Sequence, residues 1–282
     1  MHHNLNNRIM RKFTKKKEAE IISLYKNGYS QKEIADKFDT FNTSIRRVLL
    51  RNKIKIRGND KIQRYCKHNP FKKHDEYSEY FLGLLITDGC IRYKDGRNRI
   101  NLSLNERDGY LIEEFIKWAA PTSKITKIYQ KLNSSFIWSA TISNRESVDF
   151  LERAGNFKNK SYEAKLYIPI TWDILRGIVD GDGGFYKTNK NGLKLSVCGK
   201  SIVLIQQIHQ FLKKYGLNPK IQLNHGLYYI HLYRKDEVII AGKLLYDNAH
   251  IFCKRKYEKW LAFYESRRAN GVNSRKETAI QP

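Results

Sequence analysis

The sequence predicts an α+β protein with a duplicated unit and a small all-α unit in front of it. Two short apolar runs each end in an acid followed by glycine, at Asp88-Gly89 and at Asp182-Gly183. After each run the residue pattern indicates the order hairpin, helix, hairpin, helix, so each unit reads αββαββα. Residues 14–57 show helical periodicity alone. An internal duplication of this kind predicts two similar halves related by a pseudo-two-fold axis.

Composition indicates a large anionic partner. The chain has 282 residues, enough for one large domain and a small one, and 41% of them are hydrophobic, which permits a substantial core. Lys and Arg together number 53 against 28 Asp and Glu, a formal net charge of +25. Such an excess favours nucleic acid as the partner, with a membrane surface as the competing anion. No apolar run approaches the ~18 residues of a bilayer-spanning helix, so we expect no membrane insertion.

The cysteines and the start of the chain indicate a reducing compartment. The four cysteines are scattered without a C-x-x-C pair, which argues against a disulfide framework or a thiolate zinc site. Residues 1–17 are polar and basic and lack the apolar core of a signal peptide. We therefore expect a protein that is not secreted, in the cytoplasm of a phage-like or bacterium-like host or in an organellar matrix.

The first segment, residues 14–57, has the pattern of three short helices. Thr14 opens the first helix and Asn27-Gly28 ends it. Ser30 and Glu33 have the spacing of a capping box at the start of the second. The third helix, residues 43–52, has one apolar face and one basic face. This arrangement resembles a helix-turn-helix DNA-binding domain, assigned to residues 1–57, although a basic helix in an unrelated bundle is the alternative.

In such a domain the third helix enters the major groove, and side chains at its start reach base edges. The residues at those places are Asn42, Thr43, Ser44, Arg46 and Arg47. Residues 58–75 are polar and basic and are interpreted as a linker that lies along the phosphate backbone.

The two repeats follow the linker, with an inter-repeat connection at residues 156–170. The first repeat, residues 76–155, has predicted helices at 76–87, 108–119 and 145–154 and predicted strands at 91–94, 99–105, 124–131 and 136–142. The second, residues 171–268, has predicted helices at 172–181, 201–215, 238–246 and 254–268 and predicted strands at 185–188, 193–198, 220–224 and 227–233. Residues 269–282 form a polar tail.

Strand alternation divides the sheet residues into two faces. We expect the helices to be faced by Leu193, Leu195, Val197, Ile221, Leu223, Ile230 and Leu232. The opposite face carries cations and hydrogen-bonding groups that suit base-edge and phosphate contacts. Its candidate DNA-binding residues are Arg99, Asn101 and Ser103 in the first repeat and Lys194, Ser196, Lys220, Gln222, Asn224, His231 and Tyr233 in the second. An ordinary solvated sheet face is the alternative.

The two apolar runs resemble the paired signature of the LAGLIDADG homing endonucleases. Residues 81–89 and residues 175–183 each align with all nine positions of that signature, and the resemblance covers about residues 75–268. It implies two saddle-like antiparallel sheets and a two-motif, monomeric protein. The first copy departs from the pattern because Ile86 replaces an acid that the second copy keeps as Asp180. The family's metal-binding acids match Asp88 and Asp182, so we expect Asp180 to cap or hydrogen-bond locally.

The physical chemistry of the signature agrees with a metal site. Gly83 and Gly177 have no side chains, so helices that carry them can approach closely. Two carboxylates held side by side repel, and a divalent cation relieves that repulsion. The cofactor expected is Mg²⁺, which prefers oxygen ligands, with Mn²⁺ able to substitute. The resemblance adds the backbone carbonyls of Thr87 and Gly181 as metal ligands beside Asp88 and Asp182. Simple helix capping by the two acids is the alternative.

The family also places a lysine late in each repeat, near the reacting phosphate. Lys160 and Lys256 are the candidates, with Lys158 and Lys254 as close alternatives. A lysine there would stabilise developing negative charge, whereas surface lysines of a basic protein are the alternative reading. Asn105 and Lys200 occupy the places of polar residues that order solvent in the family.

The resemblance implies a metal-dependent, site-specific endonuclease that cuts both strands of DNA. The cut would be staggered, with short 3′ overhangs, at a long asymmetric site. Two alternatives stay open. One is an RNA maturase that binds its host intron RNA and assists splicing. The other is a DNA-binding transcription regulator of the same fold.

Overall fold

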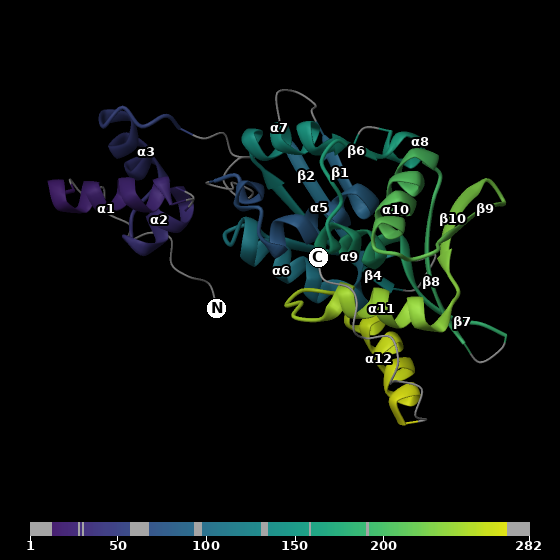
Figure 1. The fold of residues 1–282 in the computed structure, drawn as a ribbon. Helices are drawn as coiled ribbons and strands as arrows, with labels where there is room; N and C mark the ends of the chain where they lie inside the picture. Colours follow the sequence, from purple (N-terminus) through teal and green to yellow (C-terminus); the bar gives the residue numbers. More distant parts are fainter. Residues whose placement is uncertain are drawn as a thin grey trace.

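The computed structural model describes residues 13–27, 29, 31–56, 68–92, 98–130, 135–157, 159–189 and 192–269 (Figure 1). The expected mixed fold with antiparallel sheets is confirmed. One four-stranded sheet has the order β1-β2-β4-β3, and a second has the corresponding order β7-β8-β10-β9. Within the described residues no helix is both long and apolar enough to cross a membrane.

The N-terminal unit contains three helices around a small core of its own. They are α1 (Lys15–Lys26), α2 (Gln31–Lys37) and α3 (Asn42–Arg51). Ile21, Ile34, Ile45 and Leu49 fill the space between them and are almost fully buried. Thr14 caps α1 by accepting a hydrogen bond from the backbone N–H of Lys17 at 3.4 Å. The expected capping box lies outside the described residues because it needs Ser30.

Two helices form the centre of the main body (Figure 1). These are α5 (Glu76–Asp88) and α9 (Trp172–Asp182), and they carry the two apolar runs. Asp75 caps α5 through the N–H of Ser78 at 2.9 Å, and Thr171 caps α9 through the N–H of Ile174 at 3.2 Å. A Cβ on Gly177 would lie 2.1 Å from the carbonyl oxygen of Tyr80, so only glycine permits this approach of the two helices.

Each central helix leads into an antiparallel sheet backed by helices. The first half contains β1 (Gly89–Arg92), β2 (Arg99–Asn105), a 3-10 turn (Glu106–Asp108), α6 (Gly109–Ala119), β3 (Ile125–Gln130), β4 (Ser135–Ser143) and α7 (Arg145–Ala154). The second contains β7 (Gly183–Lys187), β8 (Leu193–Gly199), α10 (Ile202–Lys214), β9 (Lys220–Asn224), β10 (Leu227–Leu232), α11 (Lys235–Tyr246) and α12 (Lys254–Ala269). One hydrophobic core extends through both halves and includes the central helices.

Two segments expected to be irregular have structure. The end of the predicted linker forms a 3-10 turn, Pro70–Lys73, whose Phe71 is buried against Trp118 and Phe150. The inter-repeat connection contains β5 (Gly155–Asn156), α8 (Lys160–Glu163) and β6 (Lys165–Leu166), with β5 and β6 paired antiparallel. Elements of two to four residues are too short to produce a periodic pattern in the sequence, which explains why they were not predicted.

One expectation about the second sheet is wrong. Ile221 and Leu223 were expected to face the helices, but they are 36% and 64% exposed. They belong to β9, which is the edge strand of its sheet, and every residue of this strand is exposed. Strand alternation predicts two faces but does not show whether a helix covers either of them.

Candidate active site

The catalytic candidates Asp88 and Asp182 end the two central helices. Asp88 is the last residue of α5 and Asp182 the last of α9, and each is followed by a glycine that starts a strand. The two helix ends touch. A Cβ on Gly181 would lie 1.9 Å from Thr87 Oγ1 and 2.8 Å from Asp88 Oδ2. The structure therefore brings the four predicted metal-site residues together, since Thr87 and Gly181 directly precede the two acids.

Electrostatics at this place oppose two free negative charges. Burial, and then the neighbouring Asp182 carboxylate, raise the pKa of Asp88 to about 6. Burial also raises the pKa of Asp182. Lys160 and Lys256 act in the opposite direction on both acids and hold the pKa values down. The two acids nevertheless reach solvent, so an ion or a phosphate has access to them.

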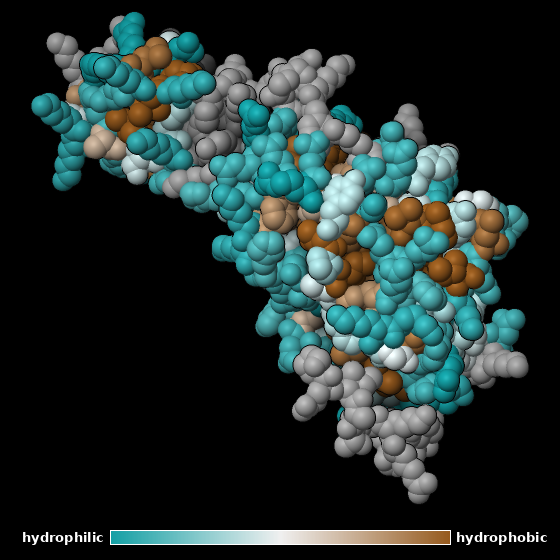
Figure 2. All heavy atoms as spheres, turned by 45° about the horizontal axis from the view of Figure 1, so that its top comes forward, coloured by the Kyte–Doolittle hydropathy of each residue, from teal (hydrophilic) through white to brown (hydrophobic). Residues whose placement is uncertain are grey.

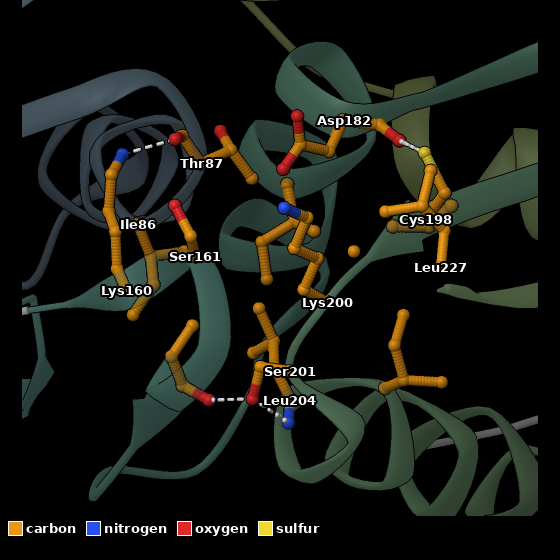
Figure 3. Close-up of a pocket in the computed structure, with 15 residues that line it drawn as sticks. Ile86, Thr87, Lys160, Ser161, Asp182, Cys198, Lys200, Ser201, Leu204 and Leu227 are labelled. Carbon is orange, nitrogen blue, oxygen red and sulfur yellow. Dashed lines mark hydrogen bonds between the residues drawn. The ribbon is translucent and has the colours of Figure 1, made fainter. Parts of the chain in front are cut away.

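Each central helix has a lysine on its last carbonyl groups. Lys160 Nζ, from α8, donates to the carbonyl of Thr87 at the end of α5 (Figure 3). It also donates to the carbonyl of Leu85 in the same helix. Lys256 Nζ, from α12, donates to the carbonyls of Val179 at 2.9 Å, Asp180 at 2.6 Å and Gly181 at 3.3 Å at the end of α9. Unpaired carbonyls at a helix end attract cations. Both candidate lysines thus lie beside the acids, whereas Lys158 lies outside the described residues.

The donor set fits a divalent cation. Two carboxylates and the nearby carbonyl oxygens are the hard ligands that Mg²⁺ prefers. The carbonyls of Thr87 and Gly181 already accept hydrogen bonds from the lysines, but a carbonyl oxygen has two lone pairs. The backbone at Gly181 leaves no room for a side chain between the two helix ends. In the described part of the chain no group of three or more His, Cys, Asp or Glu is placed to hold a metal.

A cavity of about 360 Å³ opens beside Asp182 (Figure 3). Lys160 and Thr87 lie on one side of it and Asp182 and Cys198 on the other. Lys200 also lines this cavity and donates to Tyr162 Oη at 3.2 Å. The cavity reaches Asp182 and has two lysines, Lys160 and Lys200, in its lining.

Asn105, the other candidate for ordering solvent, is engaged in a local structural role. Its side chain accepts from the N–H of Arg107 at 3.2 Å and donates to Ser135 Oγ at 3.2 Å. It therefore closes the turn that follows β2. No described contact links it to either acid.

Helix α3 exposes four of the five residues that were predicted to contact bases. Asn42, Thr43, Arg46 and Arg47 are exposed at the start of α3. The prediction that Ser44 contacts bases is wrong, because Ser44 is only 6% exposed. It stands four residues before Val48 and so shares the helix face that packs into the core. We therefore remove Ser44 from the surface available to DNA.

Two residues of the second sheet also need correction. Ser196 and His231 were expected to be exposed but are 6% and 5% exposed. They face each other across paired strands, and the His231 ring lies between the rings of Tyr229 and Tyr233, with centroids at 5.6 and 5.1 Å. Burial and then Lys194 lower the pKa of His231. These side chains cover one another, which the alternation of a single strand cannot show.

The other sheet candidates stay within reach of a ligand. Lys220, Gln222, Asn224 and Tyr233 are exposed. In the first sheet, Arg99, Asn101 and Ser103 are half-buried. The Asn101 amide donates to Ser139 Oγ, the Ala140 carbonyl and Thr141 Oγ1 at 2.9–3.0 Å, so hydrogen bonds along the sheet fix its orientation.

A second hollow, of about 490 Å³, lies where the first hairpin of the second half meets α11. Lys194 and Tyr233 line it as predicted candidates, and Lys187, Thr188 and Lys235 join them. Lys187 was missed because the residues of its predicted strand, 185–188, were not divided between two faces, and Lys235 because it lies between a predicted strand and a predicted helix. With Lys194, these two lysines lie together at one corner of the sheet, which is visible only in the folded chain. Elsewhere, hydrophilic side chains cover most of the surface in Figure 2, with separate hydrophobic patches.

Sequence reasoning also missed a buried arginine within the second run. Arg176 donates to Glu76 Oε1 at 2.8 Å and to the carbonyls of Leu245 and Ile251, each at 2.9 Å. A second cross-half ion pair joins Asp108 to Arg255 at 2.7 Å. An arginine inside an otherwise apolar helix was the available signal for the first pair. These contacts fix the position of the 250–256 segment, which carries Lys256.

Comparison with known sequences agrees with this geometry. Residues 173–245 match the LAGLIDADG-like domain family. The matched region contains α9, with Asp182, and the second sheet. The match therefore covers part of the chain, within its second half. No curated protein matches the chain.

Among solved structures, similar chains include homing endonucleases bound to DNA. A complex of I-DmoI with DNA and Mn shows 20% identity, covers 62% of this chain and 98% of its own, and has a TM-score of 0.42. The homing endonuclease I-WcaI bound to its DNA recognition sequence shows 18% identity, 73% and 96% coverage, and a TM-score of 0.48. The LAGLIDADG homing endonuclease I-GzeII with its DNA target shows 13% identity, 72% and 93% coverage, and a TM-score of 0.49.

Proposed function

We propose that this protein is a site-specific, metal-dependent DNA endonuclease that acts as a monomer and cuts both strands. The observation that carries the proposal is the meeting of Asp88 and Asp182 at the touching ends of α5 and α9. Each acid belongs to one half of the chain, so one chain supplies two cutting centres. The net charge of +25 supplies the attraction for a polyanion.

The acids and the lysines of the site would have different roles in hydrolysis. Asp88 and Asp182 would hold Mg²⁺, with the carbonyls of Thr87 and Gly181 close enough to help. The bound ion would supply an activated water and charge neutralisation at the phosphate. Lys160 and Lys256 place two ammonium groups beside the pair of acids, where negative charge develops during hydrolysis. The Gly83 and Gly177 contact holds the two helix ends, and so the two acids, close together. We expect a staggered break because the resemblance to the LAGLIDADG homing endonucleases implies one.

The DNA would lie across the two sheets. Exposed Lys220, Gln222 and Asn224 of β9 and the hollow lined by Lys187, Lys194 and Lys235 support contacts to bases and phosphates. Unlike side chains in the two halves favour an asymmetric target. The α1–α3 unit would act as a helix-turn-helix that extends this site through Asn42, Thr43, Arg46 and Arg47.

The test is cleavage of DNA that contains the insertion site of the host gene, with and without Mg²⁺. We expect metal-dependent breaks at one position on each strand. Asp88→Asn and Asp182→Asn are each expected to abolish double-strand cleavage while retaining DNA binding. Asp149→Asn is the matched control, because Asp149 lies on the surface of α7 in an exposed ion pair with Arg145. Full double-strand cutting by either active-site variant would overturn the assignment.

The same preparation separates the alternatives. Sequence-specific binding in Mg²⁺ without cutting would indicate a transcription regulator. Binding of the host intron RNA with faster splicing would indicate a maturase. Both assays use the wild-type protein, so neither depends on an active-site variant folding.

A further inference from the structure

Asp180 makes hydrogen bonds that connect it with distant segments of the chain. Its carboxylate is buried, and Oδ2 accepts from the backbone N–H of Cys253 at 2.6 Å and from Tyr80 Oη at 3.0 Å. Tyr80 belongs to the other central helix, and Cys253 directly precedes α12. The expectation that Asp180 bonds locally is therefore wrong, because both partners lie far away in the sequence.

The segment that Asp180 holds is the one that carries Lys256. The carbonyl of Cys253 accepts from the N–H groups of Lys256 at 2.9 Å and Tyr257 at 3.0 Å, so Cys253 forms the first turn of α12. The Lys256 side chain then returns to the carbonyl of Asp180 at 2.6 Å. A closed loop of hydrogen bonds results, from the Asp180 carboxylate through Cys253 and Lys256 to the Asp180 backbone.

The first half lacks this loop. When Gly83 is matched with Gly177, Ile86 takes the place of Asp180 and Ile174 takes the place of Tyr80. An apolar pair thus replaces a hydrogen-bonded pair. Lys160, the counterpart of Lys256, stands on the four-residue helix α8 and is half-buried, whereas Lys256 is 4% exposed. The two lysines are therefore held by different means.

We propose that Asp180 is a positioning residue that fixes Lys256, and only Lys256, at its place beside the paired acids. This inference rests on the proposed nuclease function for its consequence in catalysis but not for its structural content. The hydrogen bond from the Cys253 N–H to this buried acceptor anchors the start of α12, in addition to the contacts that Arg176 and Asp108 make with the same segment. Loss of that acceptor would release Lys256 from the end of α9 and leave Lys160 in place.

The first experiment measures this without DNA. Native protein is treated with an amine-acetylating reagent, and the modification of each lysine is followed by mass spectrometry. In Asp180→Leu we expect the acetylation rate of Lys256 to rise about tenfold or more, because burial and three carbonyl contacts protect it in the wild type. Lys160 is the internal control and should keep its wild-type rate. An unchanged rate at Lys256 would overturn the proposal.

Two further variants keep the test decisive. Asp180→Asn retains an oxygen acceptor and should keep Lys256 protected, which a general loss of packing would not predict. Asp180→Ala removes the acceptor without added volume and replaces Asp180→Leu if that chain does not fold. Equal exposure of Lys256 in the Asn and Leu variants would contradict the proposal.

The second experiment follows each DNA strand separately with an end label. A misplaced group at a reacting centre slows the reaction up to about 10²-fold. We therefore expect Asp180→Leu to slow one strand by about tenfold to 10²-fold, to leave the other within about twofold, and to be rescued in Asp180→Asn. Equal slowing of both strands would overturn the proposal. If the wild type cuts no DNA while the acetylation result holds, the nuclease function fails and the positioning role stands.

Discussion

The backbone of Gly83 packs directly against the carbonyl of Ile174. A Cβ on Gly83 would lie 2.0 Å from the Ile174 carbonyl oxygen and 3.1 Å from the N of Ile178. Both neighbours are backbone atoms of α9, so neither can move without moving the helix. The distance between the central helices, and hence between the acids at their ends, is set at this contact.

Gly83→Ala should therefore destabilise the fold. Excess volume in a packed interface costs about 1–3 kcal/mol, and an immovable backbone neighbour places this substitution at the upper end. Thermal or urea unfolding measures the effect. Gly199→Ala is the matched control, because a Cβ at Gly199 would meet no atom within 4 Å. Equal stability of the two variants would show that the helices can separate without cost.

The sequence predicted these glycines and acids because they belong to a short repeated pattern. The absence of side chains at Gly83 and Gly177 then indicated a close approach of two helices, with the acids at the helix ends. The same reasoning failed for Asp180 and Arg176. Each has a hydrogen-bond partner in the other repeat, 100 residues away in the sequence. Only packing of the two halves brings Asp180 to Tyr80 and Arg176 to Glu76.

Burial shows a similar limit. Alternation along a strand predicted correctly which β8 side chains form the core, such as Leu195 and Val197. It could not predict that Ser196 and His231 cover each other, since that depends on the register between β8 and β10. Nor could it predict that Leu223 is exposed, since that depends on the edge position of β9. The local sequence pattern predicts where strands form, whereas the exposure of their side chains depends on which strands and helices pack beside them.

The Arg176–Glu76 pair should contribute strongly to stability. The Arg176 side chain is 3% exposed and its guanidinium also satisfies two carbonyls. Arg176→Leu should cost about 3–5 kcal/mol, since it leaves two partly buried carboxylates, Glu76 and Asp173, and two carbonyls without this donor. Arg145→Leu is the control, because the Arg145–Asp149 pair is exposed and is expected to contribute less than about 1 kcal/mol.

Urea unfolding of the single and double variants tests the origin of this cost. Adding Glu76→Gln to Arg176→Leu should recover part of the lost stability, because one of the two uncompensated charges is removed. A double variant as unstable as the sum of the two singles would show that the ion pair does not couple these residues.

The hollow at the second sheet should govern the salt dependence of DNA binding. Log affinity falls as log salt rises. If Lys187, Lys194 and Lys235 neutralise phosphates, each Lys→Gln change makes this negative slope shallower by about one. Fluorescence anisotropy with any labelled duplex measures this slope, because the term does not depend on sequence. Lys117→Gln on α6 is the control, with a lysine that is 77% exposed and pairs with Glu114. A slope that changes only in the control would place the DNA elsewhere.

The raised pKa of Asp88 predicts that ionisation of this carboxyl lowers the stability of the folded protein as the pH rises. Burial and Asp182 raise this pKa to about 6, with Lys160 and Lys256 opposing them and Asp108 adding to them. In the folded chain the neutral carboxyl is therefore favoured, relative to an unfolded pKa of about 4. The resulting stability is fully present below about pH 4 and is lost as pH rises through about 6.

Asp88→Asn should remove this cost in metal-free buffer. Because Asp88 reaches solvent, screening limits the gain to less than about 1 kcal/mol, or a rise in Tm of roughly 2 °C at pH 7.5. At pH 4 the variant and the wild type should melt together, since the wild-type carboxyl is then largely protonated. Mg²⁺ should raise the Tm of the wild type at pH 7.5 more than that of Asp88→Asn, because the variant lacks one of the two carboxylates. A variant that is less stable than the wild type at pH 7.5 without metal would contradict the electrostatic account.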